Sequence, residues 1–238
     1  MNGTVLRLTF RGMLGRRRSL LLFALPLVMI ALAVAIRMII GTDTDAATSL
    51  LHRFALGTLL PLVALIAGTG VIAPEIDDGE IIYLLAKPVS RAAIIGAKLV
   101  AAIVLTIAFT TIPTLITGAL LTGMVTDPLP GFLAGTVVGA VAYCAVFVVL
   151  GVVSRHAAVF GLLYALVWES LVGGYVPGAR AASIQDWAYS LTYTMSSDLQ
   201  SKPEVGTAVA LPLLAAVAIA ATWLAIQRLR SLSLAGET

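Results

Sequence analysis

Six apolar runs, each close to the length that crosses a lipid bilayer, constrain this chain more than any other feature. They cover residues 20–40, 50–73, 94–123, 131–153, 157–173 and 206–226. A helix needs about 20 mainly apolar residues to span the hydrocarbon core, and only backbone that bonds to itself can cross lipid. Charged residues make up 11% of the 238 residues, against roughly 25% in soluble domains. We therefore expect an all-α membrane protein, with six transmembrane helices in one domain over residues 1–238.

Basic residues lie mainly at the ends of these runs, where they determine the orientation of a chain in a bilayer. With a cytoplasmic N-terminus, four of the fifteen Lys and Arg residues fall outside and the other eleven fall on the cytoplasmic side. The four outside are Arg37, Arg53, Arg180 and Lys202. Because Lys and Arg are retained in the cytoplasm, we expect both termini there.

Residues 1–18 precede the first run and mix arginines with apolar side chains. A step of about 100° per residue places Arg7 and Arg11 on one side of a helix and Leu6 and Phe10 on the adjoining side. Such a helix lies in the membrane interface, with its arginines among anionic headgroups. We expect an amphipathic interfacial helix, and the alternative is a disordered basic tail that only fixes topology.

Residues 174–205 form the longest stretch between two runs, on the expected outer side. Tyr175, Trp187, Tyr189 and Tyr193 make it rich in amphipathic aromatic side chains, which favour the headgroup level. We expect short helices folded back toward the outer leaflet. A gate, or a contact with an outside partner, is the alternative.

Residues 74–92 lie between the second and third runs and have the pattern of a short rigid element in the cytoplasm. Pro74 suits the first turn of a helix, and the acidic residues from Glu75 to Asp78 suit its positive end. Ser90 can cap the helix that follows. The carboxylates do not follow the spacing of a calcium loop, so we expect no metal site. An element of this shape is suited to docking on a cytoplasmic partner.

The same stretch contains a motif that continues into the third run. Its pattern is Glu75-x3-Gly79-x4-Leu84-Leu85-x2-Pro88-x-Ser90-Arg91-x2-Ile94-x3-Lys98. In this place between the second and third of six helices, the motif resembles the permease subunits of the type-2 class of ABC exporters. The basic N-terminal helix, the six-span layout and the aromatic outer segment extend the resemblance over the whole chain. The resemblance implies a multi-pass protein of the bacterial inner membrane.

The resemblance implies a function and a set of partners. In that family the segment is a coupling helix that seats in a groove of a separate ATPase subunit, and two permease chains form the translocation path. We therefore expect a cytoplasmic ATP-binding-cassette ATPase partner that binds ATP and Mg, a second permease chain of the same or a similar kind, and no cofactor on this chain. The candidate ATPase-contact or loop-shaping residues are Glu75, Asp78, Gly79, Leu85, Pro88 and Arg91.

The source of energy and the class of substrate follow from the same comparison. The sequence contains no Gly-x4-Gly-Lys-Ser/Thr phosphate loop, so a different polypeptide must bind the ATP. Family members with large outer domains act on bulky substrates, and this chain has no such domain. We expect a small amphiphile, a drug or a lipid as the substrate.

Glu169 is the most unusual residue within the apolar runs. It lies roughly 18 Å along the fifth expected helix, on a face that it shares with Gly161 and Ala165. A carboxylate at this depth normally faces protein or a wet cavity. Arg37, His52 and Arg53 lie near the outer ends of the first two helices and could pair with it. Two roles stay open: a substrate-path or gating residue, together with Arg37 and Arg53, or a structural ion pair or snorkelling acid near the outer surface.

The fourth run combines small residues at a regular spacing with the chain's one cysteine. Gly131, Gly135 and Gly139 repeat every four residues, a spacing that lets helices approach closely. We expect them to pack within the bundle. Cys144 has no partner for an intrachain disulfide, and we interpret it as a small packing residue.

Three other functions stay open, and one of them is a membrane anchor for an ATPase that transports nothing itself. An ion-coupled secondary carrier often shows internal repeats and broken helices, and the sequence has no clear repeat. An intramembrane enzyme needs a catalytic set, but neither His52 nor His156 belongs to a His-Glu-x-x-His pair and no nucleophile elbow occurs. We therefore expect a transport subunit without catalytic residues.

Overall fold

Helices form every regular element in the part of the chain that the structure describes. The computed structural model describes residues 19–72, 90–124, 127–172, 178–196, 199 and 201–234. In chain order the elements are α2 (Ser19–Ile40), α3 (Thr44–Leu50), η1 (Leu51–Leu59), α4 (Leu60–Gly70), α7 (Arg91–Thr122), α8 (Leu129–Val153), α9 (Ala157–Leu163), η2 (Tyr164–Val172), η3 (Ala179–Ala182), α11 (Ile184–Met195) and α12 (Thr207–Leu234). These residues contain no strand, which confirms the prediction of an all-α protein.

Five helices are long and apolar enough to cross a membrane: Leu20–Ile40, Thr44–Gly70, Arg91–Thr122, Leu129–Val153 and Thr207–Arg230. The fifth expected span, 157–173, is not among them. Its described part consists of α9 with 7 residues and η2 with 9. The described part of this run ends at Val172, one residue before the predicted end of the span. The predicted count of six spans is therefore not confirmed by the described residues.

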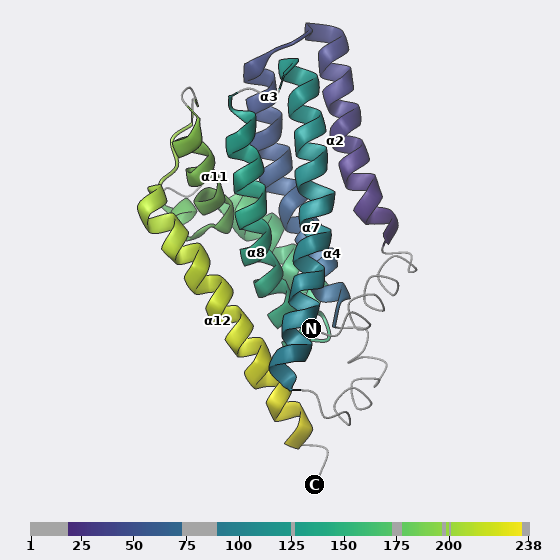
Figure 1. The fold of residues 1–238 in the computed structure, drawn as a ribbon, viewed down its shortest axis with the longest axis vertical. Helices are drawn as coiled ribbons and strands as arrows, with labels where there is room; N and C mark the ends of the chain where they lie inside the picture. The colour runs from purple at the N-terminus through teal and green to yellow at the C-terminus, as the bar shows by residue number, and fades with distance from the viewer. Residues whose placement is uncertain are drawn as a thin grey trace.

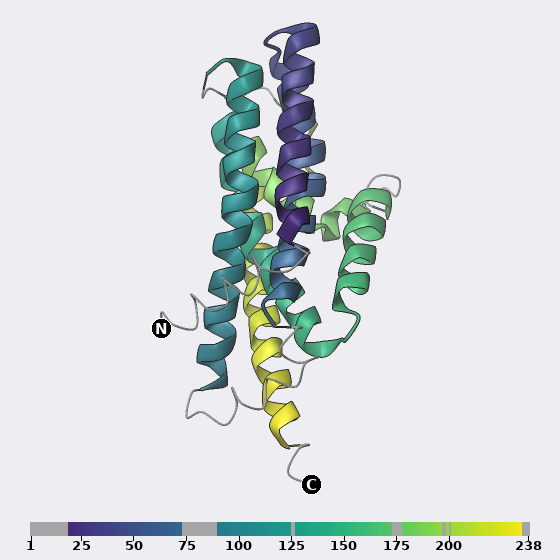
Figure 2. The ribbon, with the colours of Figure 1, turned by 90° about the vertical axis from the view of Figure 1, so that its right-hand side faces the viewer.

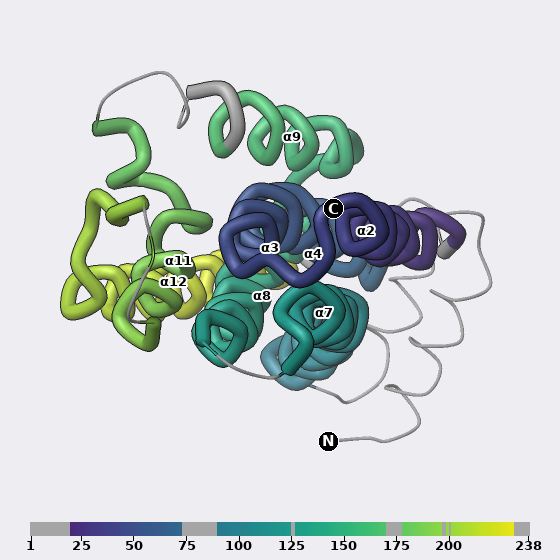
Figure 3. Tube along the Cα trace, turned by 90° about the horizontal axis from the view of Figure 1, so that it is seen from above, coloured from purple at the N-terminus to yellow at the C-terminus, as the bar shows by residue number. Residues whose placement is uncertain are grey.

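Helix α8 lies at the centre of the bundle, in contact with α4, α7, α11 and α12. Its aromatic side chains Phe132, Tyr143 and Phe147 are fully buried. Figure 1 shows α12 crossing the bundle obliquely, while α2 lies on the opposite side against α7. From above, α9 lies on the far side of α3 and α4 from α7 (Figure 3). The core of the molecule is thus built around α8.

Polar side chains and glycine mark where the long helices begin and end. Asp43 accepts two backbone N–H groups at the start of α3, at 2.8 and 3.0 Å. Ser90 accepts the N–H of Ala93 at 3.3 Å, as predicted for the start of the third span. Helix α7 ends at Gly123, whose φ of 80° is left-handed and favours glycine.

The segment α3–η1–α4 is one continuous rod with a wide turn in its middle. The N–H of Leu60 donates to the carbonyl of Ala55, five residues back, as in a π-helix. Pro61 follows directly and has no N–H to donate to the carbonyl four residues before it. The wide turn therefore lies where the ordinary α-helical ladder is interrupted.

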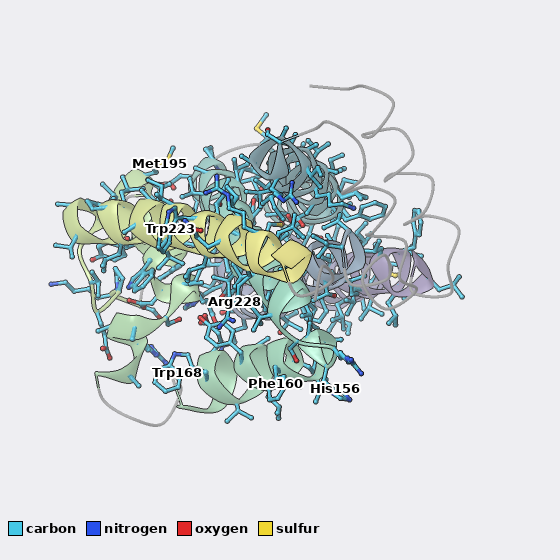
Figure 4. The ribbon with its side chains drawn as sticks, turned by 90° about the horizontal axis from the view of Figure 1, so that it is seen from below. His156, Phe160, Trp168, Met195, Trp223 and Arg228 are labelled. Carbon is cyan, nitrogen blue, oxygen red and sulfur yellow. The ribbon has the colours of Figure 1, made fainter. Side chains whose placement is uncertain are left out.

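The helix pair α9–η2 packs through a narrow stripe and exposes most of its apolar side chains. The buried stripe repeats every four residues and consists of Ala157, Gly161, Ala165 and Glu169. The exposed residues are Val159, Phe160, Leu162, Leu163, Leu166, Val167 and Trp168. Figure 2 shows α9–η2 beside the main bundle, and in Figure 4 His156 and Phe160 point away from it. Apolar side chains exposed in this way fit a lipid environment.

Two predicted elements fall largely outside the described residues. They are the interfacial helix at 1–18 and, except for its last three residues, the segment at 74–92.

Candidate functional site

The carboxylate of Glu169 joins η2 to the start of α11. Its side chain is only 4% exposed. Tyr164 Oη donates to Oε1 at 2.9 Å, and Ser183 Oγ donates to Oε2. The backbone N–H groups of Ile184 and Gln185 donate to Oε1 at 3.2 Å and to Oε2 at 3.4 Å. One side chain thus receives four hydrogen bonds, three of them from the beginning of another helix.

These contacts complete the first turn of α11, whose N–H groups have no partner within the helix. Ser183 is the N-cap, and its Oγ accepts the N–H of Asp186 at 3.2 Å. Glu169 accepts the other two N–H groups of that turn. A carboxylate at this end is also stabilised by the helix dipole. Glu169 is therefore a second cap of α11, supplied by a different element.

The groups around Glu169 are suited to an acceptor in this position. The backbone N–H groups of Ile184 and Gln185 can only donate, and one of them reaches each carboxyl oxygen. The Ser183 hydroxyl bridges the carboxyl group and the N–H of Asp186. The positive end of α11 favours an acceptor at this place.

Two tyrosines flank this carboxylate. Tyr164 donates to it, whereas Tyr143 of α8 interacts with it electrostatically without a hydrogen bond of good geometry. The Tyr143 hydroxyl is buried and has no hydrogen-bond partner among the described residues. Phe147 lies between the two rings, with centroids 5.9 Å from Tyr143 and 6.4 Å from Tyr164. Buried polar groups of α8, η2 and α11 thus converge at one point.

The structure does not bring Glu169 together with either candidate arginine. In the described part of the chain, the hydrogen bonds to Glu169 come from Tyr164 and from the start of α11. Arg37 donates instead to the carbonyl of Leu120 and so joins the ends of α2 and α7. Arg53 lies exposed on η1.

Helix α11 lies on the glycine-rich face of α8. A Cβ at Gly131 would lie 2.8 Å from the carbonyl oxygen of Thr192, and one at Gly135 would lie 3.0 Å from that of Ala188. A Cβ at Gly139 would lie 3.3 Å from the Cβ of Ala188. Thr192 Oγ1 also donates to the carbonyl of Gly131 at 3.0 Å. The packing role predicted for these glycines is confirmed: Gly131 and Gly135 admit α11, and Gly139 admits both α11 and Leu60 of α4, whose Cδ2 would lie 2.7 Å from a Cβ at Gly139.

The other side of α11 is tied to η1 and to the segment that leads into α12. The imidazole of His52 stacks on the ring of Tyr189, with 3.9 Å between centroids. Tyr189 Oη donates to the carbonyl of Ser201 at 3.0 Å, and Asp186 accepts the N–H of Glu204 at 3.0 Å. Burial raises the pKa of the Asp186 carboxyl, and the hydrogen bond from Glu204 opposes that shift. These contacts hold α11 from three directions.

Arg91 is the one candidate ATPase-contact residue within the described ranges. It is the first residue of α7, follows the Ser90 cap, and is half-buried. The other candidates lie outside the described residues: Glu75, Asp78, Gly79, Leu85 and Pro88.

Glu169 could be singled out from the sequence, but its hydrogen-bond partners could not. Ser183 and Asp186 are spaced as Ser-x-x-Asp, a pattern typical of helix starts. The N-cap of α11 could therefore have been predicted from the sequence. Nothing in the spacing linked that cap to a carboxylate 14 residues earlier.

Comparison with known protein families agrees with this membrane architecture. The family model described as ABC-2 family transporter protein matches residues 14–175. The match covers more than half of the chain and includes α2 to η2, the segment at 74–92 and Glu169. No curated protein matches the chain at a significant level. The chain therefore belongs to the ABC-2 family of transporter proteins and is a transmembrane permease of the type-2 ABC class.

Proposed function

We propose that this chain is the permease subunit of an ATP-driven exporter for a small amphiphile, a drug or a lipid. With a second copy of itself, or with a similar chain, it forms the translocation path. The ABC-2 family match over residues 14–175 is the observation that supports this function most directly. The described residues form a bundle of mainly apolar helices without a separate soluble domain, which fits a cargo that partitions into the bilayer.

Energy enters from a separate cytoplasmic ATPase that binds ATP and Mg. The sequence contains no phosphate-loop motif, so this chain depends on a partner for nucleotide binding. The ATPase docks on the 74–92 segment, where Glu75, Asp78 and Gly79 shape or contact the interface. Leu85, Pro88 and Arg91 complete the proposed docking element. Arg91 starts α7, one of the long helices of the bundle, so a force on the segment is applied directly to that helix.

The orientation of the bundle follows from its charged end. The start of α7, the turn after α8 and the end of α12 lie at the same end of the bundle in Figure 1. Arg91, Arg155, Arg228 and Arg230 belong to these positions. A cytoplasmic location for this end agrees with the retention of basic residues inside. Both termini then lie in the cytoplasm, which requires the chain between α8 and α12 to cross the bilayer once.

Gating is assigned to Glu169 and α11. Because Glu169 is bonded to the start of α11, movement of η2 is transmitted to α11 and to the α8 face beneath it. Arg37 joins α2 to α7 at the opposite end from the coupling segment. Arg53, which is exposed on η1, is the remaining candidate for the path.

The proposed function is tested by affinity purification of the tagged chain from its own host in a gentle detergent. We expect recovery of an ATPase with a phosphate loop. Arg91→Ala should reduce the recovered ATPase several-fold, while Arg155→Ala, an exposed arginine at the same end of the bundle, should not.

Purification of the chain without any ATPase across several detergents would contradict the exporter function. Transport that survives ATP depletion but stops when the proton gradient collapses would instead identify an ion-coupled carrier. A reaction product formed by the purified chain alone would identify an enzyme.

A further inference from the structure

Lys98 joins the two helices that flank the proposed ATPase-docking segment. Its side chain is 1% exposed, and its Nζ donates to the carbonyl oxygen of Val71 at 2.5 Å. Val71 is the C-cap of α4, and Lys98 lies two turns into α7. The two residues are 27 positions apart and stand on either side of residues 73–89.

The carbonyl of Val71 is one acceptor that stabilises the buried cation of Lys98. A lysine ammonium is costly to bury unless it is bonded to an acceptor. The carbonyls at the C-terminal end of a helix have no partner within the helix and carry partial negative charge. The carbonyl of Val71 belongs to this end of α4. The fold thus matches the charge of Lys98 to the negative end of a neighbouring helix.

The joint between α4 and α7 is anchored in the core. Ile72, next to Val71, is fully buried, and a Cβ at Gly151 of α8 would lie 2.9 Å from its Cγ2. A Cβ at Gly68 would lie 2.7 Å from the Cβ of Phe147, so α4 and α8 are in close contact along this end. The end of α4 therefore has little room to move independently of α8.

We propose that Lys98 is a positioning residue for ATP coupling. By bonding the end of α4 to the first turns of α7, it fixes the two helix ends that flank residues 73–89 relative to each other. A force on the segment then moves α4 and α7 together. The coupling role rests on the proposed function, whereas the joint itself does not.

The joint is tested by hydrogen–deuterium exchange of the purified chain, with Lys98→Met, Lys98→Arg and Lys202→Met compared with the wild type. Methionine fills similar volume without a donor, arginine keeps the charged donor, and Lys202 is an exposed lysine that receives the same change. We expect amides in 66–72 and 90–98 to exchange about tenfold faster in Lys98→Met, because a charged hydrogen bond is lost. Arginine should restore protection, and α12 should be unchanged in every variant. Unchanged exchange in Lys98→Met would overturn the joint.

The coupling role is tested on the same variants by recovery of the ATPase. We expect Lys98→Met to lose most of the ATPase that the wild type, Lys98→Arg and Lys202→Met retain. Faster exchange with full ATPase recovery would restrict Lys98 to stability and overturn its coupling role. Failure of the wild type to recover an ATPase would contradict the exporter function, and the exchange data would still decide the joint. If Lys98→Met does not fold, Lys98→Gln, whose donor is one bond shorter, replaces it.

Discussion

The hydroxyl of Ser183 and the carboxylate of Glu169 together satisfy the first turn of α11, although the two residues come from different elements. The start of α11 therefore cannot slide along α8 without breaking hydrogen bonds to both carboxylate oxygens. A gate that includes α11 must either carry η2 with it or release Glu169.

Glu169→Gln should destabilise the chain by about 1.5–3 kcal/mol, the range for hydrogen bonds to charged groups. The amide has one acceptor oxygen, and its NH2 group would face a backbone N–H of Ile184 or Gln185. The thermal midpoint of the detergent-purified chain measures the effect. Gln185→Ala is the matched control because it keeps the backbone N–H that binds Glu169. Equal midpoints for Glu169→Gln and the wild type would show that the carboxylate does not hold α11.

Gly135→Ala should lower stability by about 1–3 kcal/mol through overpacking. The added methyl group would lie 2.7 Å from Thr192 Oγ1 and 3.0 Å from the carbonyl oxygen of Ala188, so α11 must shift away from α8. Gly96→Ala is the control, since nothing lies within 4 Å of its Cβ position and alanine favours a helix. The measurement is the thermal midpoint, together with the monodisperse fraction after purification. A larger loss for Gly96→Ala would contradict the packing of α11 on this face.

The positions of five spans could be predicted because an apolar run of about 20 residues is stable mainly as a helix across the lipid bilayer. The second span shows where hydropathy alone misses a boundary. Its helix begins at Thr44 because Asp43 caps it, although the first turns are polar and the apolar run starts near residue 50. The spacing of Gly131, Gly135 and Gly139 predicted close packing but not the helix packed there, because spacing describes only one of the two surfaces.

The fifth run shows a different limit of the sequence. Its composition is as apolar as that of a span, and in its described part α9–η2 buries only one stripe of side chains. Composition indicates the solvent that a helix tolerates, but it does not show which other elements the helix contacts. The partner of Glu169 was missed for the same reason, since three of its four donors belong to a helix start that follows later in the chain.

Ser90→Ala should loosen the first turn of α7 at a cost of about 1 kcal/mol. The hydroxyl accepts the N–H of Ala93, and no other side chain caps this start among the described residues. Hydrogen exchange should therefore rise several-fold in the first turn of α7 but not in its middle. Ser90→Asp keeps an acceptor and should behave as the wild type. Uniform exchange across α7 in Ser90→Ala would show that the cap does not determine where the helix begins.

The orientation of the chain is tested by its reactivity toward a membrane-impermeant maleimide in intact cells. Cys144 is the chain's one cysteine and is fully buried, with its Sγ 3.1 Å from Thr106 Oγ1, so the wild type should stay unlabelled. Lys202→Cys and Arg155→Cys each place a thiol at an exposed position, at opposite ends of the bundle in the proposed orientation.

We expect Lys202→Cys to label in intact cells and Arg155→Cys to label only after the membrane is permeabilised. Basic residues are retained on the cytoplasmic side, and Arg155 belongs to the basic end of the bundle. The reverse pattern would place the 74–92 segment outside the cell, where a cytoplasmic ATPase cannot reach it. Labelling of both variants in intact cells would indicate that the cells are permeable to the maleimide. The control is a second protein with cytoplasmic thiols, which must stay unlabelled in the same cells. The expected pattern is therefore a condition for the exporter function as well as for the topology.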